Sequence, residues 1–182
     1  MSAPMLVLLP ATSDTPHGFR RVRSSPGFMT TCGEFYVHES EPILATRITT
    51  AHLNAQDIVH GGFLATLADS AYGVVLRRTN PELIPRTAQL SVSYLGAVRE
   101  GEFVEARVTL HKIGKRLMNG SCDVYVRSEE RFSRNAETEA AISYAVFCLK
   151  KRRCSRQACS RAALSIRPWQ IGRASCRERV YA

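Results

Sequence analysis

One segment of this sequence has the apolar spacing of a long buried helix, and it limits the possible folds more than any other feature. The segment runs from about Gly62 to Arg77, and Thr79-Asn80-Pro81 predicts where the helix ends. Apolar residues cover a wide arc of the helix, so we expect a sheet to wrap around it rather than to contact one side only. The residues that recur every three or four positions are Phe63, Leu64, Leu67, Ala71, Val74 and Val75.

The segments around this helix alternate between apolar and polar residues, which predicts β-strands. Two strand-like runs precede the helix, FYVHES and PILATRITT. Four follow it: TAQLSVSYLGAV, EFVEARVTLHKIG, RLMNGSCDVYV and AAISYAVFCLK. One long helix followed by a meander of antiparallel strands predicts an α+β fold, with a central helix wrapped by an antiparallel sheet.

The chain of 182 residues has room for one domain with a sizeable core. We expect an N-terminal extension over 1–13, the domain over 14–150, and a basic, disordered tail over 151–182. Nine Lys and Arg residues and one Glu lie in that tail, which leaves a net charge of +1 for the rest of the chain. No basic–aromatic pattern accompanies the charge, so we expect no nucleic-acid partner, although binding through the tail is an alternative.

The lack of recognisable targeting signals and the use of cysteine predict a cytoplasmic protein. The N-terminus lacks the basic region of a secretory signal, and no apolar run reaches the roughly 18 residues of a membrane span. We therefore expect no membrane association. The cysteines lack metal-ligand spacing, so reduced thiols are the favoured interpretation.

Two peptides resemble translated sequencing-adapter DNA rather than natural protein. RSEERFSRNAE at Arg127–Glu137 and IGRASCRERV at Ile171–Val180 correspond to two reading frames of one shared adapter stem. A polar hairpin loop and a disordered basic tail would explain their composition but not this match. We therefore expect both segments to be foreign to the natural protein.

The start and the middle of the predicted helix carry unusual residues. Gly61 and Gly62 would leave backbone N–H groups uncovered at the positive end of the helix dipole, where they can polarise a carbonyl oxygen. Asp69 lies about two helical turns further along, among small and apolar residues. It could act on a water or a carbonyl carbon. The alternative is that the glycines only allow tight packing and that Asp69 faces solvent.

The segment HLNAQDIVHGGFLATLADSAYG resembles the signature of hotdog-fold acyl-CoA thioesterases of the PaaI (phenylacetic-acid-degradation) type. That family has an Asn, then His-Gly-Gly six residues later, then an Asp on the long helix. Here these are Asn54, His60, Gly61, Gly62 and Asp69. The similarity extends over about residues 30–150. It implies a hotdog fold and hydrolysis of an acyl-CoA thioester, without a metal or cofactor.

The resemblance also implies a role for each residue. The amides of Gly61 and Gly62 would polarise the thioester carbonyl, and Asp69 would act as general base or as nucleophile. Asn54 would position the water or the substrate. Thr87 lies where related enzymes often carry a serine that helps to place the water. The site would form across a subunit interface, so we expect a homodimer or homotetramer.

Substrate-binding residues are expected at two further places. His60 would lie at the helix entry, where a structural role is favoured over a catalytic one. Lys112, Lys115 and Arg116 in HKIGKR are suited to the phosphates of CoA, although an ordinary solvated turn has the same composition. The alternative function is a non-catalytic acyl-CoA-binding or regulatory hotdog protein.

Overall fold

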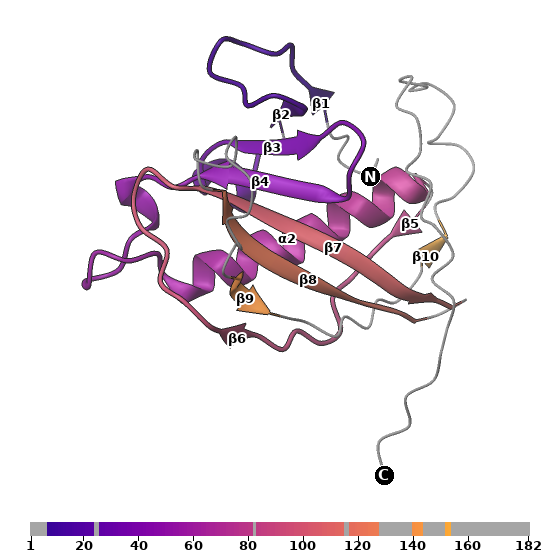
Figure 1. The fold of residues 1–182 in the computed structure, drawn as a ribbon. Helices are drawn as coiled ribbons and strands as arrows, with labels where there is room; N and C mark the ends of the chain where they lie inside the picture. Colours follow the sequence, from indigo (N-terminus) through magenta and orange to yellow (C-terminus); the bar gives the residue numbers. More distant parts are fainter. Residues whose placement is uncertain are drawn as a thin grey trace, which may run out of the picture.

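Figure 1 shows the computed structural model, which describes residues 7–23, 26–81, 83–114, 117–127, 140–143 and 152–153. Its main element is helix α2, Gly61–Thr79, which lies along the sheet. The predicted helix is therefore confirmed, and it begins one residue earlier and ends two residues later than expected. His60 is its N-cap and Asn80 its C-cap.

Eight of the described strands form one large antiparallel sheet in the order β1-β2-β3-β4-β7-β8-β9-β6. Strands β5 (Leu83–Ile84) and β10 (Arg152–Arg153) form a separate pair. Two short helices, α1 (Phe28–Thr31) and η1 (Thr50–His52), precede α2. The strands of the large sheet are β1 Val7–Leu8, β2 Phe19–Arg23, β3 Phe35–His38, β4 Ile43–Arg47, β6 Ser93–Tyr94, β7 Phe103–Ile113, β8 Met118–Arg127 and β9 Ala140–Ser143.

The core lies between α2 and the strands β4, β7 and β8, of which β7 and β8 cross the helix in Figure 1. Leu67, Ala71 and Val75 on α2 are completely buried. They share one apolar cluster with alternate residues of β8, among them Cys122 and Val124. Each buried Leu or Val side chain contributes about 1.5–3 kcal/mol, so this cluster fixes the helix on the sheet. The predicted α+β hotdog fold, a long helix wrapped by an antiparallel sheet, is confirmed.

One predicted strand is largely wrong. Within the alternating segment 87–98, only Ser93 and Tyr94 form a strand, β6, which pairs with Ile142 and Ser143 of β9. Most of residues 86–97 are exposed. Residues 144–150 of the neighbouring predicted strand lie outside the described residues.

Two residues of the predicted N-terminal extension belong to the large sheet. Val7 and Leu8, within the predicted N-terminal extension, pair with β2 and extend the large sheet. Residues 154–182, which include the peptide 171–180, lie outside the described residues. Of the peptide 127–137, only Arg127 is described. No helix in the described ranges is both long enough and apolar enough to cross a membrane.

Candidate active site

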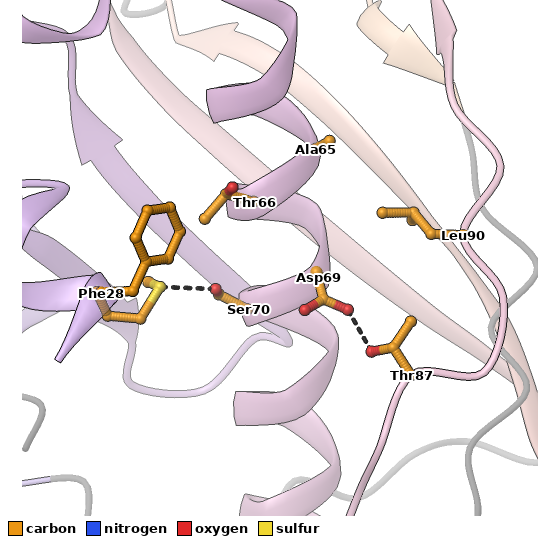
Figure 2. A pocket seen from close by; sticks show the side chains of 8 residues that line it. Phe28, Ala65, Thr66, Asp69, Ser70, Thr87 and Leu90 are labelled. Atoms are coloured by element: carbon orange, nitrogen blue, oxygen red, sulfur yellow. Dashed lines mark hydrogen bonds between the residues drawn. The ribbon is translucent and has the colours of Figure 1, made fainter.

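A pocket of about 430 Å³ opens beside α2, between helix α1 and the loop that follows β5. In Figure 2, α2 runs through the middle, with Phe28 on one side and Thr87 and Leu90 on the other. Apolar side chains therefore border the pocket on both sides of α2, whereas the helix itself presents polar groups to the same space. The lining residues are Phe28, Met29, Ala65, Thr66, Asp69, Ser70, Thr87 and Leu90.

Asp69 is half-buried in this pocket and is bonded to Thr87. The Thr87 hydroxyl donates a hydrogen bond to Oδ1 of Asp69 (Figure 2). This bond fixes the side chain and occupies one of its two oxygens. The structure thus brings together two of the predicted site residues that lie 18 positions apart in the sequence. A carboxylate held in this way can accept a proton from water or attack an electrophilic carbon.

The start of α2 is held by side chains on both sides. His60 caps the helix, and its Nδ1 accepts a hydrogen bond of 2.9 Å from the Gly62 N–H. The Tyr94 hydroxyl donates a bond of 2.9 Å to the Gly61 carbonyl oxygen. Of the two glycine amides, that of Gly62 therefore already has an acceptor. The Gly61 N–H has no recorded acceptor among the described residues.

Asn54 lies in the loop before α2 rather than in the pocket. Its side-chain Oδ1 accepts a hydrogen bond of 2.8 Å from the Gln56 N–H, and its own N–H donates to the Ile58 carbonyl at 2.8 Å. These bonds form a compact turn that leads to the helix N-terminus. Within one chain, Asn54 and the two glycines are therefore not among the residues that line the pocket with Asp69.

Of the predicted phosphate-binding residues, the structure describes Lys112, which lies apart from this pocket. Lys112 is exposed near the end of β7 and does not line the pocket. Lys115 and Arg116 lie outside the described residues. Lys112 thus lies at a solvent-exposed strand end, and its ammonium group is accessible to an extended ligand and to bulk water alike.

Several pocket residues were not predicted from the sequence. Phe28 and Met29 belong to α1, in a segment where the sequence has little periodicity. Ser70 Oγ contacts Met29 Sδ at 3.0 Å and so links α1 to α2. A helix of four residues has no sequence period, so only the fold reveals that α1 borders the pocket. The sequence predicts Leu90 only as part of a strand.

The fold and the pocket together define a class of protein. A half-buried carboxylate, a hydroxyl bonded to it and apolar side chains in one pocket are groups that can serve hydrolysis of an apolar ester or thioester. The class is therefore a hotdog-fold protein with a candidate hydrolase site.

Comparisons with known proteins narrow this class. Residues 56–132, which include all of α2 and β7, match the family model described as the thioesterase superfamily. A curated Pseudomonas aeruginosa protein named "Putative esterase PA0474" is 28% identical over 117 residues, which is 62% of this chain and 87% of that protein.

Two solved structures share the fold. Zebrafish thioesterase superfamily member 2 has a TM-score of 0.58 and 18% identity, over 70% of this chain and 87% of that one. A mutant of the phenylacetic acid degradation protein PaaI from Thermus thermophilus has a TM-score of 0.52 and 21% identity, over 67% and 96%. The resemblance to hotdog-fold thioesterases is thus confirmed, and these matches support a thioester hydrolase.

Proposed function

We propose that the protein is a cytoplasmic acyl-CoA thioesterase that hydrolyses a thioester to a free carboxylic acid and CoA. The observation that carries this proposal is the half-buried Asp69, oriented by Thr87 beside an apolar wall, in a segment that matches the thioesterase superfamily. CoA as the leaving group is supported by two structural neighbours with TM-scores of 0.51. One is the broad specificity acyl-coenzyme A thioesterase HI0827, and the other is BH2602 of Bacillus halodurans, whose structure contains CoA.

In the proposed reaction, Asp69 uses the carboxylate oxygen that Thr87 leaves accessible. As general base, this oxygen takes a proton from water while the water oxygen bonds to the thioester carbon. The C–S bond then breaks, and the CoA thiolate leaves and is protonated. As nucleophile, the same oxygen would bond to the carbon and release the thiolate, and water would then hydrolyse the resulting anhydride. Both routes need the Asp69 anion.

Negative charge develops on the thioester oxygen in either route, and a backbone amide would stabilise it. Gly61 is the better candidate, because the Gly62 N–H already donates to His60. An amide at the N-terminus of a 19-residue helix also has the favourable end of the helix dipole. In this account His60 has a structural role at the helix entry.

The spacing along α2 supports a proposed site that two subunits share. Gly61 and Asp69 are eight residues apart, which is about 12 Å along a helix at 1.5 Å per residue. The attacking oxygen and the carbonyl oxygen of one thioester are both bonded to the same carbon, so one chain cannot supply both groups. We therefore place Asp69 of one subunit opposite Gly61 and Asn54 of a second subunit, in a homodimer or a homotetramer.

Features of the described chain agree with such an assembly. Tyr94 and Leu95, beside the start of α2, are 53% and 62% exposed, so apolar surface remains there for another subunit. HI0827 is described as hexameric.

Lys112 and the adjacent basic residues 115 and 116 are proposed contacts for the phosphates of CoA.

Thiol release from a panel of acyl-CoAs tests the reaction. The proposal predicts turnover with at least one aryl, short-chain or long-chain substrate. Saturable binding of acyl-CoA without thiol release would instead show a binding protein.

Mixing two inactive variants tests the shared site. Asn54→Ala and Asp69→Asn would each inactivate both sites of a homodimer. After subunit exchange, half of the dimers would be mixed and would contain one intact site, so activity should recover to about a quarter of the wild-type value. No recovery in mixtures that mass spectrometry shows to contain mixed dimers would contradict a shared site.

A further inference from the structure

The peptide group that joins Gly61 to Gly62 is hydrogen-bonded at both ends by side chains. Its carbonyl oxygen accepts from the Tyr94 hydroxyl at 2.9 Å, and its N–H donates to Nδ1 of His60 at 2.9 Å. The first N–H groups of a helix have no partner within the helix, and consecutive glycines add conformational freedom at this point. The two side chains thus restrain a peptide group that would otherwise be among the most mobile in α2.

The Tyr94 ring also occupies the space beside Gly61. A Cβ atom at this position would lie 2.9 Å from Cζ of Tyr94 and 3.1 Å from its hydroxyl oxygen. The glycine is therefore needed for the approach of Tyr94, in addition to leaving the amide uncovered. Tyr94 comes from β6, 33 residues further along the chain, so the contact is a tertiary one rather than part of the helix.

The bonds at the next peptide group affect the Gly61 amide. The Gly61 N–H belongs to the preceding peptide, which joins His60 to Gly61. That peptide is part of the ring closed by the bond from the Gly62 N–H to the His60 side chain, so tilting of the Gly61–Gly62 peptide would either break this bond or turn the Gly61 N–H with it. An oxyanion donor is effective only when its direction is fixed before the reaction. Holding the Gly61–Gly62 peptide therefore also holds the N–H that is proposed to contact the thioester oxygen.

We propose that Tyr94 is a positioning residue, which acts through its hydrogen bond to the Gly61 carbonyl to fix the direction of the Gly61 amide in the oxyanion site. This inference rests on the proposed thioesterase function. His60 secures the opposite end of the same peptide group. Tyr94 acts through Gly61 rather than on the reacting atoms, so its removal weakens catalysis without abolishing it.

Tyr94→Phe tests the inference most cleanly, because it removes the hydroxyl and keeps the ring against Gly61. We expect kcat to fall about ten-fold, a fraction of the 10²–10³ attributed to loss of a whole oxyanion donor, while KM stays unchanged. Tyr36→Phe is the matched control. It also removes one hydroxyl hydrogen bond, to Glu34 at 3.1 Å in the same sheet, and should leave kcat unchanged.

Amide hydrogen exchange supplies a readout that does not depend on activity. In Tyr94→Phe the Gly62 amide should exchange several-fold faster than in the wild type, whereas amides in the middle of α2 should not change. Unchanged Gly62 exchange, or faster exchange with a wild-type kcat, would overturn the positioning role. If the wild type hydrolyses no acyl-CoA, the proposed function fails, and unchanged or faster Gly62 exchange still decides whether Tyr94 restrains this peptide.

Discussion

Replacing Gly61 by alanine would place a methyl group where the Tyr94 ring lies. The new Cβ would be 2.9 Å from Cζ of Tyr94, closer than such contacts normally occur. The ring is the outer end of a side chain that is 53% exposed, so it can swing away, and the backbone need not move. The main loss is then the hydrogen bond to the Gly61 carbonyl, worth about 1 kcal/mol.

Gly73→Ala is the matched control, because it is the same substitution in the same helix. A Cβ at Gly73 would meet no atom within 4 Å, so this variant should gain the helix propensity of alanine, up to about 1 kcal/mol. For Gly61→Ala the same gain is offset by the lost bond and by residual crowding. The free energies of unfolding of the two variants should therefore differ by about 1–2 kcal/mol.

Urea denaturation at one fixed protein concentration measures this difference. In a Tyr94→Ala background the penalty at Gly61 should disappear, which gives a coupling free energy of about 1 kcal/mol between the two positions. Equal stabilisation by Gly61→Ala and Gly73→Ala would refute the contact on which the positioning argument depends.

Three further predictions concern other parts of the chain. Thr87→Val removes the hydroxyl that orients Asp69 and should lower kcat about ten-fold, whereas Thr87→Ser should stay near the wild-type rate; equal rates for all three proteins would rule out this role. Burial lowers the pKa of His38 below its ordinary 6.5, so protonation opposes folding. The stability that His38 contributes should be complete above pH 6.5 and lost as the pH falls towards the folded-state pKa, and His38→Asn should remove this part of the pH dependence of urea denaturation. An unchanged pH slope in that variant would contradict the assignment. Resequencing of the source locus should show neither 127–137 nor 171–180, and an intact genomic match to both peptides would disprove their adapter origin.

The sequence predicts the parts of this fold that depend on local periodicity. The three- and four-residue spacing in α2 predicts its position to within two residues, because burial of one face decides which residues must be apolar. The strands β7 and β8 follow from alternation in the same way. Alternation over residues 87–98 does not tell where a strand begins and ends, and only Ser93 and Tyr94 form β6.

The same distinction applies to the candidate site, whose residues could be predicted from the sequence but whose contacts could not. Asp69, Gly61 and Thr87 could be selected from their spacing and from the family resemblance. Their contacts could not, since Thr87 reaches Asp69, and Tyr94 reaches Gly61, only through the tertiary fold. The capture of the Gly62 amide by His60 depends on a side-chain rotamer, which motif spacing does not specify.

The rate of thioester hydrolysis by Asp69→Asn tests the central claim most directly. Asparagine keeps the shape of the side chain and can still accept the hydrogen bond from Thr87, but it has no negative charge to take a proton or to attack the carbonyl carbon. With the best substrate of the acyl-CoA panel, we predict normal folding and assembly, retained acyl-CoA binding and a kcat lower by about two or more orders of magnitude. Hydrolysis by Asp69→Asn at the wild-type rate would contradict the account.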